Sequence, residues 1–366
     1  MSIYFFYSAT MFGYKVKSLP INRRTMATSK WMDLATPDPE FKAFLDKAGP
    51  LPKLSDAAHV PIPAIRAGGA KNHVPVPGVN VPESLDGVTK SRISIPVRDG
   101  SSIEALLYQP AVKSDDSPLV VAYHGGGWCL GVPESEEVNC VNAVRHFNAV
   151  AVSVAYRLAP EHPFPTPVED SWDALKWIAA NAASLHANPS KGFLVHGESA
   201  GGNMATVITL LARDEKLSPP VTGLSASAPA VLSPEVVPER FKAEYLSVEQ
   251  NKDAPGLDRA SIDLLLSHYK PDRSSPLFSP FIWPTGQAGL PPVFFQVCGL
   301  DTQRDEALLY ERLLREEAGV KTKLTVYPGL PHAFWAFFPQ LDASRKAVGK
   351  VVEGFGWLLG KETTAV

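Results

Sequence analysis

The stretch FLVHGESAGG, residues 193–202, decides the fold. Residues Phe193 to His196 predict a strand, and Ala200 to Asp214 follow it with apolar side chains at helical spacing. Ser199 stands between the two, at the centre of Gly-x-Ser-x-Gly. A serine on a sharp strand-to-helix turn needs small neighbours two residues before and after it, because the backbone there is strained and closely approached. The pattern therefore predicts Ser199 as a nucleophile rather than as a residue of an ordinary turn.

Further short runs of β-branched and aromatic residues accompany this strand on both sides along the chain. Several are apolar throughout, which is typical of strands buried on both faces of a parallel sheet. The eight expected strands are 92–97, 103–109, 118–124, 150–156, 192–197, 221–228, 293–299 and 323–328, and the expected helices are 135–147, 168–183, 200–214, 303–318 and 341–359. This alternation predicts an α/β fold with a mostly parallel eight-stranded sheet flanked by helices.

Two stretches do not follow this alternation. Residues 33–87 are rich in proline, which excludes long helices and central strands, and residues 230–283 are also broken by prolines around an amphipathic piece at 259–269. We expect both to be insertions over one end of the sheet, within a single domain of residues 33–366. Residues 1–32 are expected to be a disordered extension, with Met26 as an alternative start and a targeting segment left open because the stretch is basic.

Charge and cysteine content exclude several classes of protein. The chain has 35 basic and 38 acidic residues, a net charge of −3, which offers no footprint for nucleic acid. It has no apolar run of about 18 residues, so we expect no stable membrane insertion. The three cysteines, Cys129, Cys140 and Cys298, fit no metal pattern and are expected to be buried thiols. We therefore predict a cytoplasmic protein.

A glycine-rich loop follows the expected strand 118–124. The sequence His124-Gly125-Gly126-Gly127-Trp128 can bring unpaired backbone amides close to a ligand. Preorganised N–H donors stabilise negative charge that develops on a carbonyl oxygen, and the amide of Ala200 at the start of the next helix is a further donor. A phosphate-binding loop is the alternative, but neither a Lys-Ser/Thr pair nor Gly-x-Gly-x-x-Gly is present.

A serine nucleophile needs a base and an acid that orients the base, in the chain order Ser, Asp or Glu, His. Two histidines follow Ser199. His332 lies in a loop after the last expected strand and is the preferred base, whereas His268 lies on an expected helix of the insertion. The preferred acid is Asp301, two residues after the strand 293–299, and Asp305 in the next helix is the alternative.

Together these residues resemble the hormone-sensitive-lipase family of α/β-hydrolases, which has His-Gly-Gly-Gly before a Gly-Asp-Ser-Ala-Gly-Gly turn. The segment Tyr156 to Pro165, followed by Asp170, is also similar to that family and is interpreted as scaffolding behind the glycine loop. The resemblance implies a lid formed by 33–87 and 230–283. It assigns Ser199 as the nucleophile, with His332 and Asp301 as its partners, and the oxyanion hole to the amides of Gly126, Gly127 and Ala200, with Gly125 beside it; His124 is then structural. Glu198 and Thr302-Gln303 depart from the family pattern.

The function that this resemblance implies is a serine carboxylester hydrolase, acting through an acyl-enzyme on short- to medium-chain or small-molecule esters, without a metal or cofactor. Two other functions stay open: an amidase such as an arylformamidase, and a non-catalytic receptor like the plant gibberellin receptor, which has lost the catalytic histidine. His332 is present here. The expected partner is a small ester, and a homodimer is left open.

Overall fold

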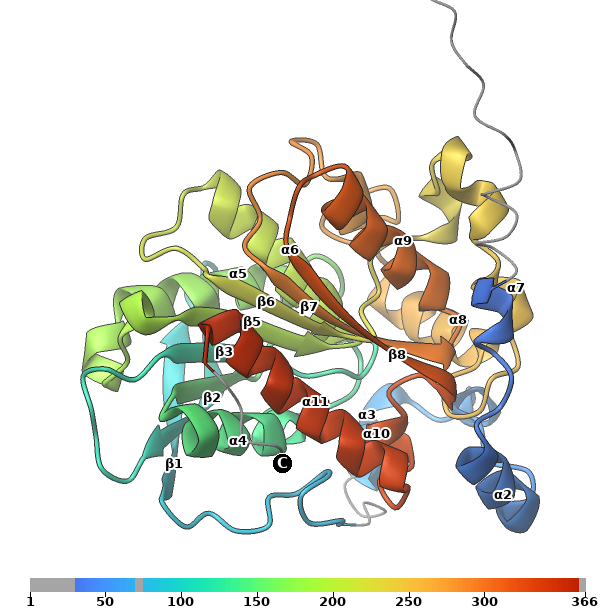
Figure 1. Ribbon diagram of the computed structural model, residues 1–366, viewed down its shortest axis with the longest axis horizontal. Helices are drawn as coiled ribbons and strands as arrows, with labels where there is room; N and C mark the ends of the chain where they lie inside the picture. The colour runs from blue at the N-terminus through green and yellow to red at the C-terminus, as the bar shows by residue number, and fades with distance from the viewer. Residues whose placement is uncertain (1–29, 70–74, 362–366) are drawn as a thin grey trace, which may run out of the picture.

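The fold is built on one eight-stranded sheet. The structure, a computed structural model, describes residues 30–69 and 75–361. The strand order is β1-β2-β4-β3-β5-β6-β7-β8. The pairs β1–β2 and β2–β4 are antiparallel, and the pairs from β4 to β8 are parallel. Figure 1 shows this sheet between two groups of helices. The predicted fold class is therefore confirmed.

All eight expected strands are present, with shifted ends. They are β1 (Val88–Pro96), β2 (Ser102–Pro110), β3 (Leu119–Tyr123), β4 (Val150–Val154), β5 (Phe193–Glu198), β6 (Gly223–Ser227), β7 (Val293–Leu300) and β8 (Thr322–Pro331). Every residue of β3, β4 and β6 is buried, which explains the apolar run of β3 and the mostly apolar run of β4, whereas β6 carries two buried serines. Strand β8 is longer than the predicted 323–328. A register shift in β7 brings Pro331 opposite Leu300 and extends the pairing up to His332.

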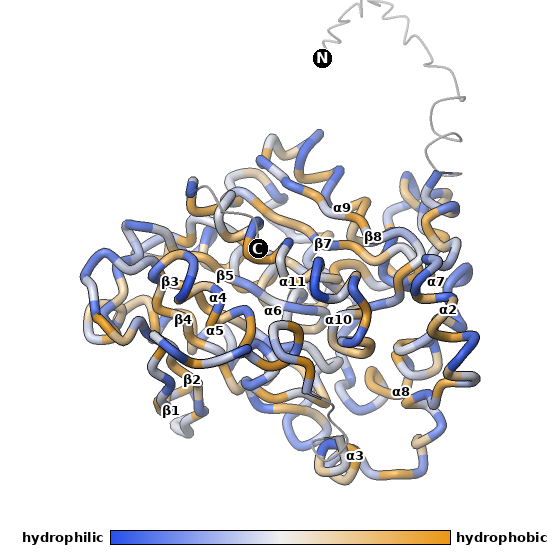
Figure 2. Tube along the Cα trace, turned by 60° about the horizontal axis from the view of Figure 1, so that its bottom comes forward, coloured by the Kyte–Doolittle hydropathy of each residue, from blue (hydrophilic) through white to orange (hydrophobic). Residues whose placement is uncertain are grey.

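Helices cover both faces of the sheet. They are α4 (Glu137–Phe147), α5 (Thr166–Ala180), α6 (Ala200–Asp214), α9 (Arg304–Glu316) and α11 (Asp342–Leu359), and a 3₁₀ turn at Pro133–Glu136 replaces the start of the predicted helix 135–147. Alternate residues of each strand face the two layers: Val121 and Val195 pack in the cluster with α5, α6 and α9, whereas Val120 and Leu194 pack with α4 and α11. In Figure 2 the hydrophobic segments run mostly through this interior.

The two predicted lid segments contact each other and the ends of the strands. They contain α2 (Pro39–Ala48), a 3₁₀ turn at Leu54–Ala57, α3 (Ile62–Gly69), α7 (Ser247–Gln250) and α8 (Arg259–Tyr269). The amide of Ser55 donates to Ser261 Oγ at 3.1 Å, and Lys53 Nζ lies 3.0 Å from the Asp258 carboxylate. In Figure 1 the two segments lie together at the end of the sheet to which β8 points.

The amino-terminal boundary differs slightly from the prediction. The prediction of a disordered extension lies outside the described residues up to position 29. Residues 30–32, assigned to the same extension, pack on the fold: the Arg312 guanidinium lies 5.4 Å from the Trp31 ring centroid, and Gln250 Nε2 donates to the Met32 carbonyl at 2.8 Å.

The cysteines and the helices bear on two expectations from the sequence: buried thiols and no membrane-spanning segment. The three cysteines are buried free thiols, as predicted. Among the described residues, no helix has both the length and the apolar character needed to cross a membrane.

The packing of α11 on the sheet depends on a close approach at Gly354. A Cβ atom at this position would lie 2.2 Å from the ring of Phe294 on β7. We expect Gly354→Ala to lower the free energy of unfolding by about 1–3 kcal/mol through overpacking, measured by urea unfolding. Gly68→Ala is the control, because an added Cβ meets no atom within 4 Å there. Equal effects of the two substitutions would contradict this account of the α11 packing.

Candidate active site

Ser199 sits on a strained turn between β5 and α6. Its φ of 54° and ψ of −117° place a non-glycine residue in a rarely populated region of backbone space. The turn is crowded on both sides: a Cβ at Gly197 would lie 2.1 Å from the Gly201 carbonyl oxygen, and one at Gly201 would lie 1.9 Å from that of Tyr123. The two glycines around the serine are therefore required by close backbone approach, as the sequence pattern indicates.

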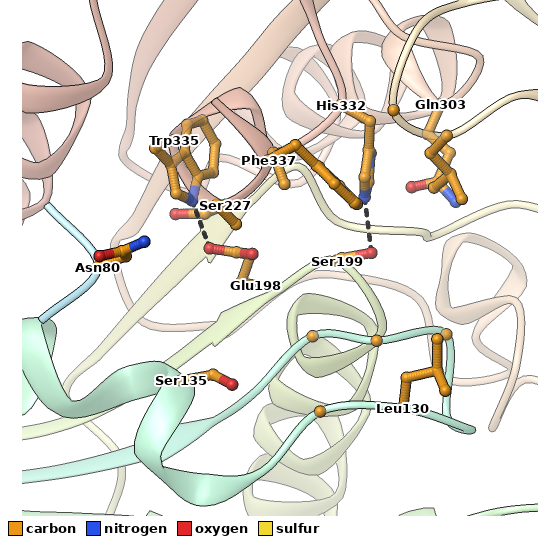
Figure 3. Close-up of a pocket in the computed structure, with 18 of the residues that line it drawn as sticks. Asn80, Leu130, Ser135, Glu198, Ser199, Ser227, Gln303, His332, Trp335 and Phe337 are labelled. Atoms are coloured by element: carbon orange, nitrogen blue, oxygen red, sulfur yellow. Dashed lines mark hydrogen bonds between the residues drawn. The ribbon is translucent and has the colours of Figure 1, made fainter. Parts of the chain in front are cut away.

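The structure brings Ser199, His332 and Asp301 together in one chain of hydrogen bonds. His332 Nε2 lies 2.7 Å from Ser199 Oγ, and His332 Nδ1 lies 2.7 Å from Asp301 Oδ2; Figure 3 shows the first contact as a dashed line. Asp301 directly follows β7 and His332 directly follows β8. With Nδ1–H donating to the carboxylate, Nε2 accepts the proton of the serine hydroxyl. This arrangement can activate a nucleophile.

The surroundings of His332 favour its protonated form. The ring is buried, with an exposed fraction of 2%, and burial by itself lowers the pKa of an imidazole. The charge of Asp301 and its hydrogen bond outweigh that effect and, with a smaller contribution from Glu198, hold the pKa of His332 above its ordinary value of 6.5. The imidazolium that forms when the serine loses its proton is thus stabilised.

The alternative base and acid lie elsewhere. His268 is on α8 and is not among the residues that line the cavity above Ser199. The carboxylate of Asp305 accepts hydrogen bonds from the amides of Leu246 and Ser247, at 2.8 and 2.7 Å, and from Arg304. Asp305 therefore holds the start of α7, in the predicted lid segment 230–283, and no local sequence pattern marks this role.

The glycine loop presents free amides beside Ser199. Gly126 and Gly127 have φ of 115° and 59°. An added Cβ would lie 2.2 Å from the Leu130 carbonyl oxygen at Gly126, and 2.5 Å from the Leu265 side chain at Gly127. Within the described part of the chain, the amides of Gly126, Gly127 and Ala200 have no protein acceptor. They are available to an oxygen atom bound at Ser199.

The segment after β4 supports this loop from behind. The Tyr156 hydroxyl donates to the His124 carbonyl at 2.7 Å, and the two rings stack with centroids 4.3 Å apart. The segment itself is held by Arg157, whose guanidinium donates to Asp170 at 2.8 and 2.7 Å. These contacts agree with the scaffolding that the sequence predicts for Tyr156 to Pro165, and with a structural His124.

The lid helix α3 is fastened to the same segment. Arg66 Nε donates to the Cys129 carbonyl at 2.6 Å, just after the glycine loop. Its other nitrogens bond the Ala159 carbonyl and form a bidentate pair with Glu161 at 2.8 Å. Arg66 thus connects helix α3 with two backbone segments near the glycine loop, one at Cys129 and one at Ala159. No local sequence pattern marks Arg66, because its partners lie 63 to 95 positions away.

Known proteins with similar sequences and structures identify the family. Residues 120–336 match the family described as the alpha/beta hydrolase fold. An AB hydrolase superfamily protein of Schizosaccharomyces pombe is 41% identical over 276 residues, which is 75% of this chain and 81% of the relative. The chain belongs to the α/β-hydrolase family. Within that family, the resemblance to the hormone-sensitive-lipase-like branch is confirmed.

Two further relatives extend the comparison. A carboxylesterase of Mycobacterium tuberculosis is 38% identical over 270 residues, 72% of this chain and 77% of the relative. The crystal structure of vibralactone cyclase superposes with a TM-score of 0.77 at 34% identity, covering 90% of this chain and 96% of that chain. As a member of the α/β-hydrolase family with such relatives, the protein is a hydrolase.

A cavity of about 340 Å³ lies over Ser199 in this α/β-hydrolase. Its walls come from the glycine loop, α8, α10 (Phe334–Phe337) and α11. Glu198 and Trp335 also line it. From the sequence, Glu198 is only a departure from the family pattern, and no pattern singles out Trp335. The one available signal was an acidic residue next to the proposed nucleophile.

The electrostatics of His332 can be tested by NMR titration of its ring. We expect an imidazole pKa above 6.5 in the wild type. In Asp301→Asn the pKa should fall, because the negative charge that stabilises the imidazolium is gone while the burial remains. Glu104→Gln removes an exposed carboxylate that pairs with Arg92 and should leave the His332 titration unchanged. A His332 pKa that is the same in all three proteins would contradict the ion pair.

Proposed function

We propose that the protein is a serine carboxylester hydrolase that acts through an acyl-enzyme. The observation that carries the proposal is the hydrogen-bonded chain from Asp301 through His332 to Ser199. It lies beside three amides without protein acceptors. The carboxylesterase named among the relatives supports the same reaction class.

In the proposed mechanism His332 Nε2 removes the Ser199 proton as Oγ attacks the ester carbonyl carbon. The carbonyl oxygen becomes negatively charged and accepts hydrogen bonds from the amides of Gly126, Gly127 and Ala200. The imidazolium then donates its proton to the leaving alkoxide, which departs as the alcohol and leaves an acyl-serine. Water, deprotonated by His332, attacks the acyl-serine and releases the acid, and the proton returns to Ser199 Oγ.

The cavity supports small substrates. About 340 Å³ accommodates a small-molecule ester or a short to medium acyl chain, and its lining is mostly apolar apart from a few polar groups. An amidase would need the same residues, but no specific contact in the cavity favours an amide. The presence of His332 in hydrogen-bond contact with Ser199 argues against a receptor that has lost its base.

The proposal is tested with p-nitrophenyl esters of increasing acyl length. We expect wild-type protein to prefer short to medium chains, and Ser199→Ala to lower turnover by several orders of magnitude, on the order of 10⁶-fold in a serine protease, while the fold is retained. Wild-type protein should also react covalently with a fluorophosphonate probe at Ser199. Turnover by Ser199→Ala within tenfold of wild type would remove the mechanism, and a preference for long emulsified chains would remove the substrate range.

The assignment of the acid is tested by comparing two substitutions. Asp301→Asn should lower turnover by about 10⁴-fold, the loss typical of this substitution in a serine protease triad, because asparagine favours the wrong imidazole tautomer. Asp305→Asn should keep turnover within about tenfold but lower the free energy of unfolding by about 1–3 kcal/mol, because it weakens buried bonds to the lid amides. Steady-state kinetics and urea unfolding of both variants distinguish the roles. The reverse pattern would make Asp305 the acid.

A further inference from the structure

Glu198, the residue before Ser199, has a carboxylate oxygen that the protein leaves open to the cavity. Its Oε2 accepts a hydrogen bond from Trp335 Nε1. Its Oε1 has no hydrogen-bond partner in the described part of the chain, although the side chain lines the cavity. In Figure 3 Glu198 and Trp335 lie together on one side of Ser199. A carboxylate oxygen that faces the cavity without a protein donor is available to a ligand that supplies positive charge.

No lysine or arginine of the described residues lines the cavity beside this oxygen. Of the described residues that line the cavity, Glu198 and His332 are the only ionisable ones, so no lysine or arginine balances Glu198 from that wall. Glu136 is buried behind it, where its Oε2 accepts from Asn139 at 2.8 Å and lies 3.3 Å from His196 Nε2. A cation placed in the cavity beside Glu198 therefore meets attraction and no fixed positive side chain other than the protonated form of His332.

The ionised form of Glu198 is destabilised by these surroundings. Burial, and after it the negative charge of Glu136, raise the pKa of Glu198 to about 7. The hydrogen bond from Trp335 and the positive charge on His332 and His196 act in the opposite direction. A bound cation would add to these stabilising partners and draw Glu198 into its ionised form.

The cavity differs in chemistry on the two sides of Ser199. Apolar lining comes from the predicted lid segment 230–283, through Leu257, Ile262, Leu265 and Leu266. Gln303 lines a neighbouring hollow together with Ile262 and Leu266. In Figure 3 Gln303 lies across Ser199 from Glu198. The Glu198 side carries Ser135, Asn80 and the Trp335 ring. An ester bound at Ser199 has two substituents, and among the described lining residues only Glu198 offers a carboxylate to either of them. The indole of Trp335 adds an aromatic surface that attracts cations.

We propose that the Glu198 side of the cavity binds a cationic substituent, so that the enzyme favours esters that carry an ammonium group over neutral esters of the same shape. This inference rests on the proposed ester hydrolysis and adds a substrate class to it. Anionic esters are disfavoured by the same carboxylate. Glu198 thereby acts as a specificity residue, while the proton transfers remain with His332.

Two isosteric esters test the charge preference. The first, 2-(trimethylammonio)ethyl acetate, has a permanent positive charge, and the second, 3,3-dimethylbutyl acetate, has the same shape without charge. The quantity measured is the ratio of their kcat/KM values, followed by acid release at constant pH. Glu198→Gln should lower this ratio at pH 8 by about tenfold or more, since it removes a charge next to the bound ammonium. Glu104→Gln, which removes an exposed charge outside the cavity, should leave the ratio unchanged.

The pH dependence of the ratio supplies a second readout. Because the pKa of Glu198 is about 7, its ionised fraction rises about tenfold between pH 6 and pH 8. The ratio for wild-type protein should rise by about fivefold over this range if ionised Glu198 raises it tenfold, and by at most about tenfold for a larger effect. Protonation of His332 inactivates the enzyme toward both esters alike and cancels in the ratio. In Glu198→Gln the ratio should stay flat.

The outcomes separate this proposal from the proposed function. One outcome is that both esters are hydrolysed with a ratio of kcat/KM values that is the same in wild type and Glu198→Gln, or that does not change with pH in the wild type. Either result overturns the cation site and leaves the proposed esterase in place. If neither ester is hydrolysed, protection of Ser199 from fluorophosphonate labelling by 2-(trimethylammonio)ethanol and by 3,3-dimethylbutanol gives the same comparison. Stronger protection by the charged alcohol that is lost in Glu198→Gln supports the site, and equal protection by the two overturns it.

Discussion

The strained turn at Ser199 is the constraint on which the rest of the site depends. A non-glycine residue at φ 54° and ψ −117° is destabilised by about 1–3 kcal/mol and persists only where its surroundings fix it. The surroundings here are β5, a central strand, and α6, whose residues from Ala200 to Leu210 are all buried. The Ser199 amide donates to the Ser227 carbonyl at 2.8 Å, which ties the turn to the neighbouring strand β6. The hydroxyl is thereby held at the edge of the sheet.

The register of the last two strands then determines where the partners of Ser199 lie. Parallel strands end at the same edge of the sheet, so residues that follow β7 and β8 come close to those that follow β5. The register shift between Cys298 and Leu300 pairs Leu300 with Pro331. Asp301 directly follows Leu300, and His332 directly follows Pro331. Their side chains therefore meet, with His332 Nδ1 2.7 Å from Asp301 Oδ2. A one-residue slip in this pairing would separate the acid from the imidazole.

The helix that follows Asp301 also holds the lid. Glu306 in the first turn of α9 accepts hydrogen bonds from the amides of Leu232 and Val231, at 2.6 and 3.3 Å, and Asp305 bonds the start of α7. Burial raises the pKa of Glu306. On the other side of the cavity Arg66 joins α3 to the backbone beside the glycine loop. The predicted lid segments and the residues around Ser199 are therefore joined by buried hydrogen bonds.

Much of the proposed site could be predicted from local sequence, whereas its lining could not. The glycines around Ser199 and in the loop 124–128 reflect backbone approach and positive φ, which are properties of a few adjacent residues. The choice of His332 and Asp301 needed only chain order and the rule that loops meet at the carboxyl ends of parallel strands. The helices α2 and α3 were not predicted, because both are short and lie in a proline-rich stretch, although their prolines occupy the first turn, where proline is tolerated.

By itself, the sequence determined the sheet-and-helix order, the strained turn and the residues that can serve as nucleophile, base and acid, because each leaves a local pattern in the chain. Only the tertiary structure decided that Trp335 bonds Glu198 across 137 positions, that Asp305 supports the lid, and that a carboxylate oxygen is left open beside Ser199. These features arise from side chains brought together by packing. The burial that raises the pKa of Glu198 comes from residues distant in the sequence, and no local pattern records it.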